Sequence, residues 1–139
     1  MNEERERHVF GFYAGNGGFY LLTMKPSALS DAALQKRSEP WRELDVSILH
    51  TLILDRRLGI DEKKLAEQTN VDYARSREAC IERVNAGKYQ AAFLLNPTTP
   101  RQMQRVASAG ERMPQKSTDF FPKLLTGMVF MKMQIKRSI

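Results

Sequence analysis

Gln90-Ala-Ala-Phe-Leu-Leu95 decides the fold, because it is a short run with five apolar residues in succession and no polar alternation. A run of this kind is typical of a strand that is covered on both faces. We therefore predict that residues 90–95 form the central strand of a sheet. Asn96-Pro-Thr-Thr-Pro100 then turns the chain, and Thr99 and Pro100 stand in N-cap and first-turn positions of a helix that Gly110 ends.

Three more helices are predicted upstream of this strand. Asp45 is a suitable N-cap for a buried helix over 46–58, whose apolar residues repeat at three and four positions before Gly59. Asp61 can cap a short helix that runs through Leu65. Ser76 can cap a helix over 77–86 that stops at Gly87. Between these last two, Val71 and Tyr73 alternate with polar residues and predict a short strand.

The chain begins with the pattern of a β-hairpin. Aromatic and aliphatic runs on either side of Ala14-Gly-Asn-Gly-Gly18 flank an Asn-Gly pair, the strongest short-range hairpin signal. A dinucleotide-binding loop is excluded, because a strand follows these glycines where that motif requires a helix. Residues 27–43 are read as a connector with a turn of helix near Leu34, anchored at one end by Trp41.

These elements predict an α/β (α+β) fold. The hairpin is followed by β-α-β-α-β units, with a last strand at about 124–132, and together they form a mixed sheet packed with helices. The sequence leaves the orientation of the last strand open. A chain of 139 residues fits a single domain, long enough to bury roughly two-thirds of its surface.

The composition indicates the cellular compartment in which the chain works. The single cysteine, Cys80, excludes an internal disulfide and is expected to pack inside a helix, which favours a reducing cytoplasm. The charged N-terminus is not a secretory signal, and no apolar run approaches the roughly 20 residues that span a membrane, so no membrane partner is expected.

Residues 1–60 carry eight basic and eight acidic side chains, and residues 61–96 carry six of each. The net charge of +6 therefore comes from residues 97–139, with eight Lys and Arg against two acids. An anionic partner and a merely solvated basic face are equally good explanations of this local excess.

The candidate site is the polar loop, residues 110–123, which Pro114 and Pro122 stiffen. Its candidate ligand contacts, with those of the turn after the central strand, are Arg112, Lys116, Ser117, Thr118, Lys123, Asn96, Thr98 and Thr99. Lysine beside hydroxyls suits a phosphate, and Arg112 could clamp a carboxylate or phosphate through two parallel hydrogen bonds. Because Lys-Ser-Thr lacks the glycine frame of a P-loop, no P-loop is predicted.

Three residues are candidate acids or bases: His50, Glu111 and Asp119. Each has a structural alternative. His50 can be a partly buried, satisfied core histidine; Glu111 can pair with a neighbouring cation; Asp119 can cap a turn. Ser117 and Thr118 can likewise bond local backbone. Glu111 and Asp119 could also bind a metal, but no metal site is assigned, and the sequence names no cofactor.

Three blocks resemble the signature motifs of the family catalogued as domain of unknown function 1015. They are 44–50 (Leu-Asp-Val-Ser-Ile-Leu-His), 92–99 (Ala-Phe-Leu-Leu-Asn-Pro-Thr-Thr), and 110–118 (Gly-Glu-Arg-Met-Pro-Gln-Lys-Ser-Thr) with 121–127 (Phe-Pro-Lys-Leu-Leu-Thr-Gly). The resemblance implies a relation to the ParB and sulfiredoxin type of nucleotide-binding fold, which includes free-serine kinases. It covers only the C-terminal portion of the longer family proteins, so an activity that needs both portions is expected to be absent here.

Three functions follow, in order of preference. The first is binding of a phosphorylated metabolite or nucleotide, as part of a kinase-like enzyme, with the N-terminal portion of the family protein as a partner. The second is nucleic-acid binding through the basic C-terminal third, with Phe120 and Phe121 available for stacking, although no nucleic-acid motif is present. The third is a scaffold in which the polar loop closes the sheet.

Overall fold

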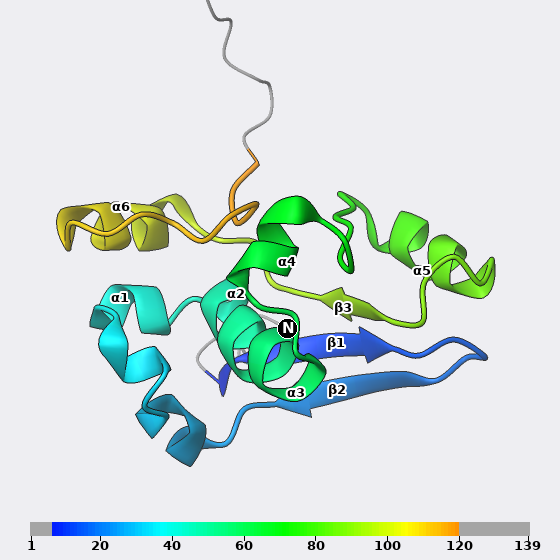
Figure 1. Ribbon diagram of the computed structural model, residues 1–139, viewed down its shortest axis with the longest axis horizontal. Coiled ribbons are helices and arrows are strands. Elements are labelled where there is room, and N and C mark those ends of the chain that lie inside the picture. Colours follow the sequence, from blue (N-terminus) through cyan, green and yellow to red (C-terminus); the bar gives the residue numbers. More distant parts are fainter. Residues whose placement is uncertain (1–6, 120–139) are drawn as a thin grey trace, which may run out of the picture.

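β1 (Val9–Tyr13) lies at the centre of the sheet in the computed structural model, which describes residues 7–119. β2 (Phe19–Thr23) and β3 (Ala92–Leu94) flank it in the order β2-β1-β3, and both pair with β1 antiparallel (Figure 1). Helices pack on this short sheet. The predicted α+β class, opening with a hairpin, is confirmed.

The hairpin turn has the geometry that its Asn-Gly pair predicts. Asn16 and Gly17 both have positive φ, +49° and +77°, and the Gly18 N–H donates to the Gly15 carbonyl (2.9 Å). Two successive positive φ values match the right-handed twist of the paired strands. The register that follows sets Phe10 opposite Leu22 and Phe12 opposite Tyr20.

The prediction that residues 90–95 form the central strand is wrong. Among residues 7–119 the strand is shorter, Ala92–Leu94, and it lies at an edge of the sheet, because Phe93 pairs with Phe12 of β1 and the sheet continues from β1 to β2. Its side chains are only partly buried, and Leu95 is 36% exposed. The apolar run predicted cover on both faces, which these half-buried side chains do not have, and it carried no information on how many strands it would pair with.

Residues 45–58 form one helical rod in three parts. α2 (Asp45–Ile48) continues into a π-helical segment (Leu49–Asp55) and α3 (Arg56–Leu58). The rod ends as predicted at Gly59, whose φ is +65°, and the Ile60 N–H returns to the Leu54 carbonyl (2.8 Å). The prediction of Asp45 as N-cap is wrong, because Leu44 holds that position and the Asp45 carboxylate binds elsewhere.

The other predicted caps are confirmed. Asp61 accepts from the Lys64 N–H at the start of α4 (Glu62–Glu67), and Ser76 accepts from the Ala79 N–H at the start of α5 (Arg77–Asn85). Thr99 forms a reciprocal capping box with Gln102 at the start of α6 (Pro100–Ser108). Each cap satisfies N–H groups that the first helical turn cannot pair internally.

The predicted strand at 71–73 is not formed. Asp72 instead accepts from the Tyr73 N–H (2.8 Å), from Arg83 (2.6 Å) and from the Tyr89 hydroxyl (3.0 Å). A side-chain acceptor next to the backbone competes with a strand ladder. Without this strand, the β-α-β unit expected around α5 is absent, and the strands among residues 7–119 are all antiparallel rather than mixed.

The connector is more ordered than its polar sequence indicated. It contains 3₁₀ turns at Pro26–Ser30 and Leu34–Lys36, followed by α1 (Glu39–Arg42). Trp41 anchors it as predicted, since it packs with Met113 against the buried side chains of Leu44, Val46 and Val106. This second cluster ties α1 to α6 beside the sheet (Figure 1).

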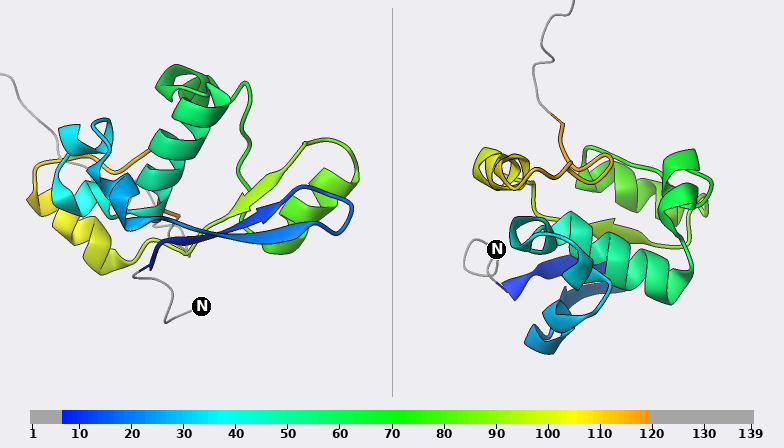
Figure 2. Two further views of the ribbon diagram at one scale, coloured as in Figure 1. Left: turned by 90° about the horizontal axis from the view of Figure 1, so that it is seen from below. Right: turned by 60° about the vertical axis from the view of Figure 1, so that its left-hand side comes forward.

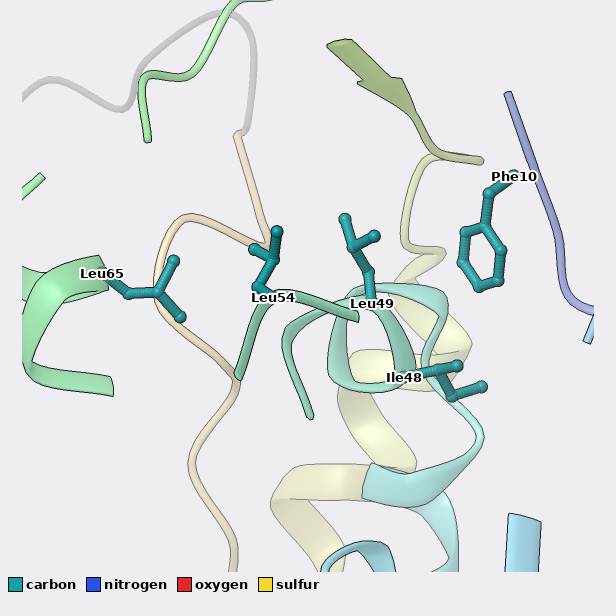
Figure 3. Close-up of a cluster of buried hydrophobic side chains, with 5 residues drawn as sticks. All are labelled: Phe10, Ile48, Leu49, Leu54 and Leu65. Carbon is teal, nitrogen blue, oxygen red and sulfur yellow. The ribbon is translucent and has the colours of Figure 1, made fainter. Parts of the chain in front are cut away.

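The main core lies between the sheet and the helical rod. Figure 3 shows its five buried members: Phe10, Ile48, Leu49, Leu54 and Leu65. The opposite face of the sheet meets α5 (Figure 2). There the Tyr13 hydroxyl donates to the Asn85 side chain (2.6 Å). Side chains of a strand alternate between faces, so Phe10 and Tyr13 serve different layers.

Three predictions concern residues that lie outside the described range 7–119. They are the last strand at about 124–132, Lys123 of the polar loop, and the stacking residues Phe120 and Phe121. Among the described helices, none has the length and apolar character needed to cross a membrane.

Because Phe10 is 2% exposed at the centre of the sheet, Phe10→Ala should lower the free energy of unfolding by about 3–5 kcal/mol. Phe19→Ala removes the same atoms from a side chain of the neighbouring strand that is 47% exposed. The loss in free energy of unfolding should therefore be much smaller than for Phe10→Ala. Urea denaturation of both variants measures the difference. Equal losses would show that β1 is not the central core strand.

Candidate functional site

A depression of about 240 Å³ lies between the turn that follows β3 and the end of the described polar loop. It is the place where the two polar segments singled out in the sequence meet. The lining residues are Pro97, Thr98, Thr99, Pro100, Met103, Lys116, Ser117, Thr118 and Asp119.

The first wall is fixed at both ends. Thr99 and Gln102 close the start of α6, and Pro100 presets the first helical turn. At the other end, the Asn96 side chain donates to Asp45 (3.1 Å) and to the Val9 carbonyl (3.5 Å). Asn96 therefore positions this turn and is not itself a lining residue.

The second wall is held by Glu111 and by a tight turn. Glu111 accepts from the Ser38 N–H (2.5 Å) and lies 3.6 Å from Arg37, beyond hydrogen-bond distance. Farther along, the N–H and hydroxyl of Ser117 both donate to the Pro114 carbonyl, at 3.3 and 2.6 Å. Inside this turn Lys116 has a φ of +56°, a conformation that non-glycine residues adopt only when their surroundings enforce it. The turn thus directs Lys116 to the depression.

The polar groups of the depression differ in what they can offer a ligand. The Ser117 hydroxyl already donates to the Pro114 carbonyl. The Thr99 hydroxyl and the Thr99 N–H both donate to the side-chain oxygen of Gln102. Among residues 7–119, no side-chain hydrogen bond engages Lys116, Thr98 or Thr118. One ammonium and two hydroxyls therefore remain as donors. The positive end of the α6 dipole adds to their attraction for an anion.

Asp119 is an acidic residue that lines the same depression, and it forms an ion pair with a second cation, Arg75. Its Oδ2 lies 2.5 Å from Nε of Arg75, which precedes α5. Arg112, the second cation expected from the sequence, is exposed and is not among the lining residues within the described chain. Arg75 is not a lining residue either, but it is paired with one, Asp119, which lines the depression together with Lys116.

The remaining candidate residues lie apart from the depression. Glu111 is occupied by the connector, and His50 lies in the π-helical segment. Burial lowers the pKa of His50 from its ordinary value of 6.5, so the neutral imidazole is favoured. Burial likewise raises the pKa of Cys80, which keeps it a thiol and fits packing rather than nucleophilic chemistry.

Sequence reasoning missed two residues. His8 lies 2.8 Å from Asp45 through Nδ1, which must carry the proton because a carboxylate only accepts. No local pattern marks His8, which stands 37 residues from its partner. Arg75 was missed because it belongs to a segment of balanced charge and stands 44 residues from Asp119 in the sequence, which hides their proximity.

Within the described part of the chain, no group of three or more His, Cys, Asp or Glu side chains is arranged to hold a metal ion. Comparison with protein-family models, curated proteins and solved structures gave no match to this chain. The resemblance to domain of unknown function 1015 therefore stays a prediction carried by its motifs.

Because the folded pKa of His50 lies below its unfolded value, this residue leaves stability unchanged where both states are neutral. As the pH falls below about 6.5, the unfolded state takes up the proton first and stability is lost. His50→Gln should therefore flatten the decline in urea midpoint between about pH 7.5 and about pH 5. Both proteins keep His8 and every carboxylate, so parallel curves would mean that His50 is not desolvated.

Proposed function

We propose that this chain binds a small anionic group, with phosphate as its natural ligand, in the depression between residues 97–100 and 116–119. The observation that carries the proposal is the convergence of the Lys116 ammonium with Thr98 and Thr118 at the start of α6. Ammonium and hydroxyl donors near a helix N-terminus are a common setting for phosphate.

The size of the depression limits what it can hold. At about 240 Å³ it falls below the roughly 300–1,000 Å³ of pockets that enclose a drug-sized ligand. It suits a phosphate group but not the whole of a nucleotide. A phosphorylated metabolite or nucleotide would place its phosphate here and extend the rest outward, past the apolar contacts of Pro97 and Met103.

Binding is better supported than catalysis. Of the three candidate acids and bases, only Asp119 lines the depression, and it is paired with Arg75. A kinase-like reaction would need further groups, and the N-terminal portion implied by the family resemblance is their natural source. We accordingly propose a ligand-binding part of such a protein, working in the cytoplasm.

Lys116→Gln tests the proposal, because it removes the charge while keeping most of the side-chain length. Losing one charge-assisted contact should weaken binding of inorganic phosphate by about 1.5–3 kcal/mol, a ten- to hundredfold loss, measured by isothermal titration calorimetry. Lys36→Gln makes the same change at an exposed lysine of the connector and should have no effect.

Thermal denaturation should show both variants folded as the parent is. Equal losses of affinity in the two variants would mean that phosphate senses only the overall positive charge. Undiminished binding in Lys116→Gln would remove Lys116 from the site and the proposal with it.

A further inference from the structure

Arg75 and Asp119 form an ion pair at the rim of the depression. Nε of Arg75 lies 2.5 Å from one carboxylate oxygen of Asp119, and Nη2 lies 3.5 Å from the other. The two nitrogens thus face the two oxygens in the side-by-side arrangement that guanidinium groups also form with phosphate. Asp119 lines the depression together with Lys116, whereas Arg75 reaches the rim only through its contact with Asp119.

We propose that Arg75 is a second ligand-binding cation, and that Asp119 occupies it until an anion with at least two free oxygens displaces the carboxylate. This inference rests on the proposed function and extends it. The second ligand-binding cation beside Lys116 is then Arg75, from the segment before α5, and not Arg112 as the sequence predicted. This inference also specifies the ligand class as phosphate-like rather than a simple halide.

The exchange is energetically feasible because the pair is exposed. The side chains of Arg75 and Asp119 are 80% and 53% exposed, and pairs of this kind contribute little. Releasing Arg75 should therefore reduce ligand affinity by no more than about fivefold. In return, the ligand gains the Arg75 guanidinium in addition to the Lys116 ammonium among the cations of residues 7–119.

Charge balance gives the exchange its direction. With the pair closed, Asp119 neutralises Arg75 and also repels an incoming anion from the wall of the depression. A phosphate monoester with two negative charges competes better for the guanidinium than a singly charged carboxylate does. The freed Asp119 can then turn to solvent, which already reaches it.

A double-mutant cycle with inorganic phosphate as the probe tests the exchange at constant ionic strength. Asp119→Asn should tighten binding by about fivefold, because Arg75 is free from the start. Arg75→Gln should weaken binding. In the double variant most of the gain from Asp119→Asn should vanish, since the residue that it frees is gone.

The neighbouring pair Arg77 and Glu78 is a matched control. It is also exposed, with a distance of 3.1 Å, and lies outside the depression. Arg77→Gln and Glu78→Gln should leave phosphate affinity unchanged. A comparable shift from these variants would assign the effects to general surface charge and overturn the inference.

Two other outcomes separate this inference from the proposed function. If Asp119→Asn gives the same gain with and without Arg75, Asp119 acts only by direct repulsion; the exchange is then wrong, while a loss in Lys116→Gln still supports the site. If the parent chain and Lys116→Gln both fail to bind phosphate, the proposed function fails and the exchange fails with it.

Discussion

The carboxylate of Asp45 connects three segments that are far apart in the sequence. One oxygen accepts from His8 at the start of β1, and the other accepts from Asn96 in the turn after β3, while the residue itself begins α2. Hydrogen bonds to an ionised group contribute about 1.5–3 kcal/mol each, more than an exposed ion pair. The partly buried Asp45 carboxylate therefore fixes the position at which the chain leaves β3. In this way it also positions residues 97–100, the first wall of the depression.

Glu111 has the corresponding role on the second wall. It binds the backbone of Ser38 in the connector, and the adjacent cluster of Trp41, Val106 and Met113 fills the space beneath. Two acidic residues that the sequence offered as a cap and as a base are thus used for positioning. Because they are held away from Lys116, the only carboxylate left at the depression within residues 7–119 is that of Asp119.

Local sequence signals predicted the turns, the helix caps and the helix ends. They did not predict which strands pair with one another. The Asn16-Gly17 turn, the caps at Asp61, Ser76 and Thr99, and the stop at Gly59 depend on a few neighbouring residues, so sequence alone identified them. The order of the strands depends on which partner β1 finds, and no local pattern encodes it. The same holds for the site: Lys116, Thr98 and Thr99 were predicted from composition and helix start signals, whereas Arg75 required the fold.

The central claim is that residues 97–100 and 116–119 make one anion site, and nuclear magnetic resonance tests it most directly. In a titration of the ¹⁵N-labelled chain with sodium phosphate, with sodium chloride of equal ionic strength as the reference, saturable amide shifts are expected. These should concentrate in the two segments and extend to Arg75. Shifts that never saturate, or that spread over Lys36, Lys63 and other exposed cations without favouring the depression, would contradict it.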